Sequence, residues 1–280
     1  MKILHSIEEC LGWRKSIKGS VGFIPTMGAL HLGHLSLVKI SKKACNRTIV
    51  SIFINPTQFS DNEDLDLYPL TTEQDLMHLK KERVDAVFMP SETDLYDNQN
   101  SEYFYDTPLS KKLEGVTRPH FFKGVTMIVN KLFNIINPTH AIFGEKDAQQ
   151  LIIIKKMIDE NKMPIRLVSG KTIRDKNGLA RSSRNSYLSK KDRELASKIY
   201  KNLLLIKSLL DSGEKNSKIL KKKFTRSINS FPDFKLDYIS IACTKTLNER
   251  DYVLDKTLVS AAVFFKGVRL IDNFTYLSST

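Results

Sequence analysis

Short apolar runs alternate with amphipathic stretches over the first 184 residues of the chain. The runs are short and mostly continuous rather than alternating between apolar and polar residues, which is typical of strands covered on both faces of a sheet. They lie at residues 21–24, 48–54, 85–89, 140–143 and 164–168. Between them, apolar residues recur at helical spacing over residues 35–44, 73–82, 125–136 and 148–160. This alternation predicts an α/β fold in which residues 1–184 form a Rossmann-like parallel sheet domain.

The pattern changes near residue 190. Two helices are predicted at residues 192–210 and 217–227. Three strands are predicted after them, at residues 236–243, 258–265 and 268–274. The last two strands are joined around Lys266 and Gly267 as a hairpin. Residues 185–280 are therefore predicted to form a smaller C-terminal α+β domain.

The composition is that of an ordinary globular protein, with 41% apolar and 27% charged residues. The apolar runs stop far short of the roughly 18 residues that a membrane helix needs, so no membrane span is expected. Glu8 and Glu9 stand where a signal peptide would carry its apolar region. Cys10, Cys45 and Cys243 are widely spaced and predict unpaired thiols. We therefore expect a cytoplasmic protein.

A net charge of +13 raises the question of a nucleic-acid partner. Residues 1–184 hold 26 basic and 21 acidic side chains, whereas residues 185–280 hold 18 and 10. The larger excess, +8, lies outside every motif described below. An RNA-binding protein would need RNP strings or a GXXG loop in a KH context, and neither is apparent. We interpret the Lys221–Lys223 run as a solvated helix face and expect no nucleic-acid partner.

The first candidate site follows the predicted strand at residues 21–24. A proline and a glycine end that strand, and Gly33 removes a side chain where a helix begins, so free N–H groups and the helix dipole favour an anion. If the helix starts near Leu30, His31 and His34 project from one side of its first turn. Two imidazoles there could stabilise charge on a phosphate. An HxxH metal pair and two surface histidines stay open as alternatives.

The loop after the strand at residues 48–54 carries Asn55 and Gln58. Their amides suit a polyol or carboxylate substrate, which needs both donors and acceptors. The alternative is that the Asn-Pro pair only ends the strand.

The loop after the strand at residues 140–143 carries Lys146, a point charge suited to a phosphate, beside a glycine that permits close backbone approach. Asp147 has an alternative reading as a helix N-cap. Gln150 lies one turn later on the same face.

The last candidate loop covers residues 172–185. Ser182, Ser183 and Arg184 offer hydroxyls and a fork of N–H donors, which suit the phosphates of a departing diphosphate. Arg174 adds a further positive charge to this loop. The alternative is a solvated surface loop.

These strings, read in order, resemble one known family. His31-Leu-Gly-His34 resembles the HxGH signature of nucleotidyltransferases, and PTMGALHLGH, INPTQF, FGEKDAQQ and NGLA…SSRN resemble the pantoate–β-alanine ligases, or pantothenate synthetases. The resemblance covers residues 21 to about 189. It implies ATP-dependent condensation of pantoate with β-alanine to pantothenate, AMP and diphosphate through a pantoyl-adenylate. It also implies Mg²⁺, a homodimer, and a C-terminal domain that closes over substrates held by the first domain.

The resemblance also implies roles for individual residues. The catalytic residues are His34, His31 and Lys146. The ATP-binding residues are Met27, Gly28, Ala29, Leu30, His31, Leu32, Gly33, His34, Gly144, Glu145, Lys146, Asp147, Ile173, Arg181, Ser182, Ser183 and Arg184. The residues for pantoate or β-alanine are Gln58, Gln150, Asn55 and Pro25. The Mg²⁺ ligands are not placed, and the candidates are Asp75, Asp147 and the acidic stretch Asp61–Asp66.

The sequence departs from the family pattern in two places. In the string at residues 113–125, the usual Gly-His pair reads His120-Phe121, so it is open whether His120 replaces the family's histidine. Arg181 stands where Met or Leu is usual, a change that a backbone contact to the base would tolerate.

A second enzymatic function stays open as well. The chain could be an adenylyltransferase of the same superfamily, which leaves AMP on its product.

Overall fold

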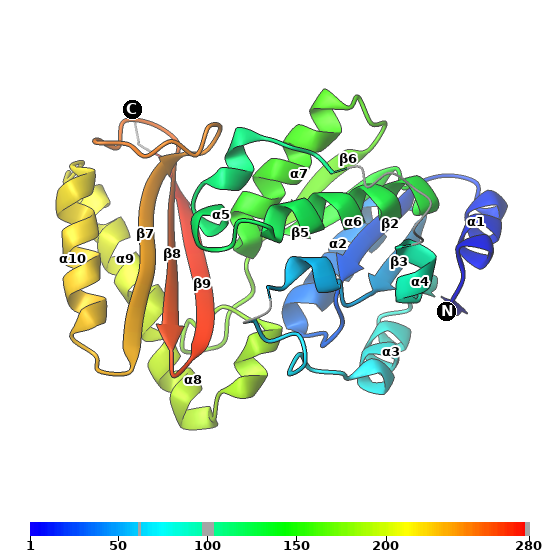
Figure 1. The fold of residues 1–280 in the computed structure, drawn as a ribbon, viewed down its shortest axis with the longest axis horizontal. Coiled ribbons are helices and arrows are strands. Elements are labelled where there is room, and N and C mark those ends of the chain that lie inside the picture. The colour runs from blue at the N-terminus through cyan, green and yellow to red at the C-terminus, as the bar shows by residue number, and fades with distance from the viewer. Residues whose placement is uncertain (61–62, 97–103, 278–280) are drawn as a thin grey trace.

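The computed structural model describes residues 1–60, 63–96 and 104–277, and the strands within them form two sheets (Figure 1). The larger sheet is parallel, with the order β1-β4-β3-β2-β5-β6. Its strands are β1 (Lys2–Leu4), β2 (Val21–Thr26), β3 (Arg47–Ile52), β4 (Ala86–Phe88), β5 (His140–Gly144) and β6 (Arg166–Gly170). The predicted parallel sheet is therefore confirmed.

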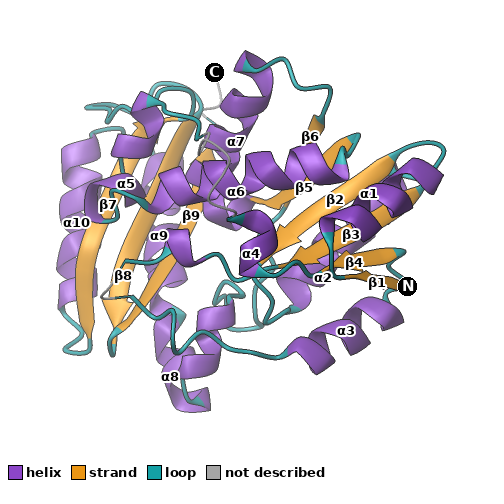
Figure 2. Cartoon of the chain, turned by 45° about the vertical axis from the view of Figure 1, so that its right-hand side comes forward, coloured by secondary structure: helices purple, strands orange, loops and turns teal. Residues whose placement is uncertain are grey.

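Each face of this sheet has its own hydrophobic core. The helices on one face are α1 (Ile7–Ser16), α6 (Phe121–Ile136) and α7 (Ala148–Glu160) (Figure 2). Those on the other are α2 (Leu32–Ala44) and α3 (Thr72–Lys81). Phe23 and Ile49 belong to the first core, whereas their neighbours Ile24 and Val50 belong to the second. All four are buried, which explains why these strands read as continuous apolar runs.

The order of the sheet reverses at β2. This strand pairs with β3 along its whole length but with β5 only at Gly22 and Phe23. The next strand in the chain, β3, lies on one side of β2, and β5 lies on the other. Open α/β sheets bind ligands in the crevice at the carboxyl ends of two such strands. The fold therefore places a binding site at the loops that follow β2 and β5.

The C-terminal part of the chain packs three helices against an antiparallel sheet with the order β7-β8-β9 (Figure 1). Its elements are α8 (Lys190–Ala196), α9 (Lys198–Asp211), α10 (Ser217–Asn229), β7 (Phe234–Cys243), β8 (Thr257–Phe265) and β9 (Val268–Tyr276). The predicted hairpin is present, because Lys266 and Gly267 take positive φ angles between β8 and β9. The prediction of a smaller α+β domain is confirmed.

The elements predicted from the sequence differ from the structure in two places. β1 and α1 were not predicted, because only Cys10 and Trp13 of α1 are buried and the apolar periodicity of this helix is weak. It also predicted one helix over residues 192–210, which was wrong. The helix breaks at Ser197, a fully buried residue whose hydroxyl donates to the Glu194 carbonyl at 2.6 Å and turns the chain between α8 and α9.

Several short elements fill the loops. They are α4 (Glu92–Leu95), α5 (Glu114–Thr117) and the 3-10 turns η1 (Pro56–Gln58), η2 (Pro108–Lys111), η3 (Glu145–Asp147) and η4 (Ser183–Tyr187). The predicted domain boundary after residue 184 falls inside η4. Leu179 and Leu188, on either side of η4, both pack in the C-terminal core, whereas Leu258 of β8 packs in a core of the large domain.

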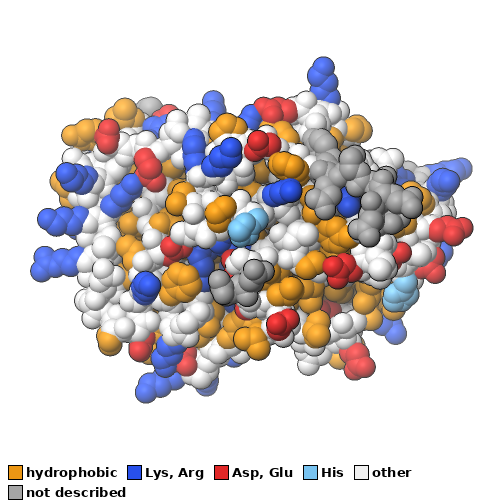
Figure 3. Space-filling view, in the orientation of Figure 1, with side chains coloured by type: hydrophobic (Ala, Val, Ile, Leu, Met, Phe, Trp, Pro, Cys, Tyr) orange, Lys and Arg blue, Asp and Glu red, His pale blue; other side chains and the backbone are white. Residues whose placement is uncertain are grey.

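The basic side chains do not gather into one patch on the face that Figure 3 shows. On the face shown in Figure 3, Lys and Arg side chains are scattered, with many over the half that holds α10 and β7. None of the described helices is long and apolar enough to cross a membrane.

Candidate functional site

A cavity of about 1050 Å³ lies between the two domains, at the loops that follow β2 and β5. Most residues that the sequence analysis assigned to a site line it. They are Pro25, Met27, His31, Gly33, His34, Asn55, Gln58, Gly144, Lys146, Asp147, Gln150, Ile173, Arg181, Ser182, Ser183 and Arg184. Five others belong to the same loops but are not among the lining residues: Gly28, Ala29, Leu30, Leu32 and Glu145.

The first turn of α2 presents two stacked histidines to the cavity. The helix begins at Leu32 rather than near Leu30, so His31 is its N-cap. His31 Nδ1 accepts the Gly33 N–H at 3.0 Å, and His34 Nδ1 accepts the His31 N–H at 3.3 Å. The two ring centroids are 4.1 Å apart. A Cβ at Gly33 would stand 2.7 Å from the His31 ring, so glycine is required for this arrangement.

Both histidines are neutral at physiological pH. Burial, followed by the charges of His34, Lys146 and Arg181, lowers the pKa of His31 to about 2. Burial lowers the pKa of His34 to about 4, with Asp147 offsetting part of the shift and Lys146 adding to it. Because each Nδ1 accepts a hydrogen bond, the proton of each neutral ring is on Nε2. The pair therefore offers two neutral N–H donors to an anion.

Asp75 holds the turn that precedes these histidines. Its two carboxylate oxygens accept the N–H groups of Ala29 at 2.9 Å and Leu30 at 2.7 Å, and Thr71 donates a third hydrogen bond at 3.2 Å. The carboxylate is 1% exposed and does not line the cavity. This geometry contradicts the suggestion that Asp75 binds Mg²⁺, because its oxygens are already used by the backbone.

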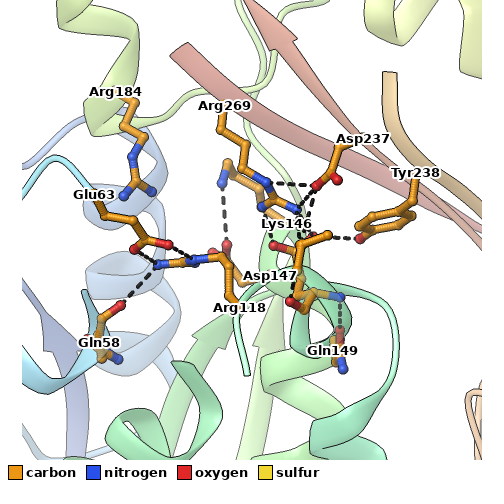
Figure 4. Close-up of polar contacts among 12 residues, drawn as sticks. Gln58, Glu63, Arg118, Lys146, Asp147, Gln149, Arg184, Asp237, Tyr238 and Arg269 are labelled. Atoms are coloured by element: carbon orange, nitrogen blue, oxygen red, sulfur yellow. Dashed lines mark hydrogen bonds and ion pairs between the residues drawn. The ribbon is translucent and has the colours of Figure 1, made fainter. Parts of the chain in front are cut away.

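The two amides of the loop after β3 differ in their surroundings. Asn55 is buried, donates to the Gly124 carbonyl at 3.1 Å, and accepts hydrogen bonds from the hydroxyls of Thr57 and Tyr96. These contacts favour the alternative that Asn55 has a structural role at the end of the strand. The Gln58 amide lines the cavity, and its backbone carbonyl accepts a hydrogen bond from an arginine at 3.0 Å (Figure 4).

Lys146 reaches the cavity from η3, directly after β5. Its ammonium lies 3.3 Å from the Asp147 carboxylate. Asp147 stands at the N-cap of α7 but makes no capping hydrogen bond, so its carboxylate faces Lys146 instead (Figure 4). Gln150 lines the cavity one turn later. Gln149 also borders the cavity, but it is largely buried and donates to the carbonyls of Leu109 in η2 and of Lys112 after it.

Each cavity-lining arginine has an acidic partner. Arg184 donates two hydrogen bonds to Asp64, at 2.9 and 2.7 Å. Arg118 donates two to Glu63, at 2.6 and 2.5 Å (Figure 4). The partner of Arg181 is Asp175, and that of Arg269 is Glu114.

Arg174, which the sequence analysis counted among the charges of the candidate loop, does not face the cavity. It does not line the cavity, because it donates two hydrogen bonds to the buried carboxylate of Asp272, at 2.6 and 2.8 Å. Its guanidinium also lies 3.5 Å from the centre of the Tyr200 ring. The charge of Arg174 therefore links the loop at residues 172–185 to β9 and does not face a ligand.

The sequence analysis missed a buried polar cluster at the edge of the cavity. Glu114 of α5 accepts hydrogen bonds from Arg269 of β9 and from the Tyr238 hydroxyl of β7, and Asp237 accepts two from Arg269 (Figure 4). Burial raises the pKa of Tyr238, which therefore stays protonated and donates. The sequence did not reveal this cluster, since Glu114 lies 124 residues before Tyr238 and 155 residues before Arg269 in the chain.

The loop that departs from the family pattern presents its phenylalanine to the cavity. Phe121 is among the lining residues, and the Arg118 guanidinium lies 3.9 Å from the centre of its ring. His120 is exposed and is not among them. The described structure thus gives no support to a replacement of the family's histidine by His120.

The cavity suits reactants that carry several negative charges. Its described lining holds seven basic side chains against five acidic ones, together with the two neutral histidine donors and the N-terminus of α2. Within the described residues, no group of three His, Cys, Asp or Glu side chains could hold a metal ion. The positive balance of the lining and its neutral donors favour binding of phosphate and carboxylate groups.

Comparison with known proteins agrees with this geometry. Residues 2–275 match the model of the family described as pantoate-beta-alanine ligase. The pantothenate synthetase of Thermosipho africanus is 44% identical over 98% of this chain and 99% of its own. That of Thermoanaerobacter sp. strain X514 is 44% identical over 91% and 90%.

Two solved structures are similar over nearly their whole length. Pantothenate synthetase from Thermus thermophilus has a TM-score of 0.92 and 33% identity over 98% of this chain and 99% of that one. The pantoate-beta-alanine ligase from Francisella tularensis, complexed with beta-gamma ATP and beta-alanine, has a TM-score of 0.80 and 35% identity over 98% and 97%.

Proposed function

This chain belongs to the pantoate-beta-alanine ligase family, and we propose that the cavity between its domains holds the reactants of that family's reaction. The enzyme condenses pantoate with β-alanine at the expense of ATP and releases pantothenate, AMP and diphosphate. In the first step, the pantoate carboxylate attacks the α-phosphorus and diphosphate leaves. In the second, the amine of β-alanine attacks the acyl carbon of the pantoyl-adenylate and AMP leaves.

The phosphates of ATP bind, in this proposal, between the start of α2 and η3. The Nε2–H groups of His31 and His34 donate to phosphate oxygens, and the Lys146 ammonium supplies a positive charge opposite them. As neutral donors, the histidines act by hydrogen bonding to developing charge rather than as general acids. The lowered pKa values and the positions of all three side chains on the cavity wall support these roles.

The departing diphosphate binds on the loop at residues 172–185. Ser182, Ser183 and Arg184 line the cavity there, beside the backbone of Ile173 and Arg181. Two N–H groups of Arg184 are held by Asp64, which fixes the plane of the guanidinium. Its remaining N–H groups are therefore presented in a set direction to the phosphates.

Pantoate binds beside Gln58 and Gln150, whose amides line the cavity and offer donors and acceptors to its hydroxyls and carboxylate. Pro25 and Phe121 provide apolar wall beside them. Asn55 acts indirectly, because its polar atoms already hold the loop after β3 to α6. This arrangement places the pantoate carboxylate within the same cavity as the nucleotide, as an attack on the α-phosphorus requires.

When bound, Mg²⁺ would be held mainly by phosphate oxygens of ATP, which is the usual way proteins use this ion. Asp147 is the protein ligand that we favour, because its carboxylate is about half exposed and faces the cavity beside Lys146. Asp64 is engaged by Arg184, Asp66 is not among the lining residues, and Asp61 lies outside the described residues. When bound, the ion would neutralise charge on the leaving diphosphate.

We also propose that the protein acts in the cytoplasm as a homodimer. The three cysteines are unpaired thiols, as expected in a reducing compartment. No nucleic-acid partner is required, since the charge of the cavity is explained by ATP and pantoate. Size-exclusion chromatography with light scattering would test the dimer, and a monomeric mass for the active enzyme would contradict it.

The proposal rests on one observation, that both histidines, Lys146 and the two glutamines line a single cavity. The decisive experiment incubates the protein with ATP, Mg²⁺ and pantoate, with and without β-alanine, and identifies the products by mass spectrometry. We expect pantothenate and free AMP only when β-alanine is present. Accumulation of an AMP-bearing product that β-alanine does not discharge would instead identify an adenylyltransferase.

A further inference from the structure

Three side chains of β9, an edge strand of the small sheet, bind segments of the large domain. Arg269 binds Glu114 in α5, and Asp272 accepts two hydrogen bonds from Arg174 in the loop that precedes η4. Asn273 binds the loop after β5. These three side chains lie within five residues of sequence, and all three line the cavity. β9 is therefore the element through which the small domain contacts the site.

The contact of Asn273 is directed at the backbone of Lys146. Its Nδ2 donates to the Lys146 carbonyl at 2.8 Å and to the Glu145 carbonyl at 3.1 Å. Asn273 itself is held in the β-ladder opposite Ser260, and its N–H donates to Asp272 at 2.7 Å. One amide thus fixes two successive peptide units of η3 from a rigid strand.

Local structure provides little other support for η3. Its N-cap, Gly144, offers no side chain, and Asp147 makes no capping hydrogen bond at the start of α7. The Glu145 side chain accepts one hydrogen bond, from Ser169 at 2.8 Å, and that bond is exposed. Two backbone carbonyls of the turn are therefore held by a residue from the other domain.

The position of Lys146 matters because its charge must meet an anion at a defined place. A displacement of about 1 Å in a catalytic group can cost on the order of 100-fold in rate. Lys146 has a flexible stem, but the origin of that stem is set by the two peptide units that Asn273 binds. We propose that Asn273 is a positioning residue, which acts in adenylate formation by fixing the backbone of Lys146. This inference rests on the proposed role of Lys146 in binding the phosphates of ATP.

The test is pantoate-dependent ATP–diphosphate exchange measured with labelled diphosphate. Asn273→Ala should lower the kcat of exchange by about 10- to 100-fold, with the KM for pantoate little changed, because Gln58 and Gln150 are untouched. Thr275→Ala is the matched control, since Thr275 lies on the same strand but is exposed. It should leave both constants as in the wild type.

A double-mutant cycle separates positioning from a general structural effect. On the Lys146→Ala background, Asn273→Ala should cause no further loss, because there is no ammonium left to misplace. A loss of the same factor on both backgrounds would overturn the proposal, as would an unchanged kcat in Asn273→Ala alone. If Asn273→Ala does not fold, Asn273→Ser serves in the same cycle and the same outcomes decide.

The outcome also distinguishes this inference from the proposed function. Absence of exchange in the wild-type protein would refute the function itself. Exchange that depends on Lys146 but not on Asn273 would refute only the positioning role.

Discussion

The loops that follow β2 and β5 line the same cavity as β9 but contribute to it differently. The loops carry His31, His34 and Lys146, which line the cavity and which we assign to the phosphates of ATP. β9 carries Arg269, Asp272 and Asn273, whose polar atoms mostly bind other parts of the protein. The comparison shows that one cavity is built from two kinds of residue, those that meet the reactants and those that hold the first kind in place.

The largest expected loss of activity is at the residues that meet the reactants. His34→Ala and Lys146→Ala should each lower pantoate-dependent ATP–diphosphate exchange by about 100-fold or more, because each removes a donor or charge that meets the developing negative charge. Thermal unfolding should change little by comparison, since neither side chain is part of a hydrophobic core. Wild-type exchange rates in both variants would show that these loops do not meet the nucleotide.

At β9 we expect a smaller effect, and on stability rather than on activity. Asp272→Asn removes the charge that pairs with the largely buried Arg174, and should lower the free energy of unfolding by about 2 kcal/mol. The matched control is Asp211→Asn, which breaks an exposed pair with Lys207 and should cost less than about 0.5 kcal/mol. Urea denaturation of both variants measures the difference. Equal losses would mean that β9 does not hold the loop as the contacts suggest.

The two histidines also predict a dependence of stability on pH. Their pKa values are lowered to about 2 and about 4, so between pH 6.5 and 4 the unfolded chain takes up protons that the folded chain does not. The free energy of unfolding should therefore fall as the pH decreases through this range, by at most about 1.4 kcal/mol per pH unit for each histidine. His34→Gln should show a shallower fall in urea denaturation at pH 6.5 and 5, and an identical fall would contradict the lowered pKa.

The smallest effect is expected at His120. It is exposed and outside the cavity lining, so His120→Ala should change exchange and overall turnover by less than about twofold. His78→Ala, on the exposed face of α3, provides a control for the loss of a surface histidine. A much larger loss at His120 alone would show that this residue enters the site when substrates bind.

The residues that meet the reactants could be predicted from the sequence because they stand in short strings directly after strands. Continuous apolar runs located β2, β3 and β5, and the topology of a parallel sheet then gathered the loops that follow them. That reasoning places Gln58 and Lys146 at the same edge of the sheet, and both line the cavity. It assigned them no contacts, because spacing along the chain does not fix the direction of a side chain.

The residues that hold the site together could not be predicted in this way. A polar side chain in a strand, such as Asp272 or Asn273, reads as solvent-facing when its partner lies about 100 residues away or more. Asp75 was misread for a related reason, since a carboxylate suggests a metal when its backbone donors are 45 residues distant. Partners at such separations become visible only once the chain is folded.

β9 has a further consequence for the order in which the protein is made. The motifs that meet the reactants all lie before residue 185, so they emerge from the ribosome before β9 is synthesised. The large sheet can form early, as N-terminal domains generally do. The ties to Glu114, Arg174 and the backbone of Lys146 can form only once residues 269–273 have been added. A nascent chain therefore carries every motif of the enzyme before it carries a finished site.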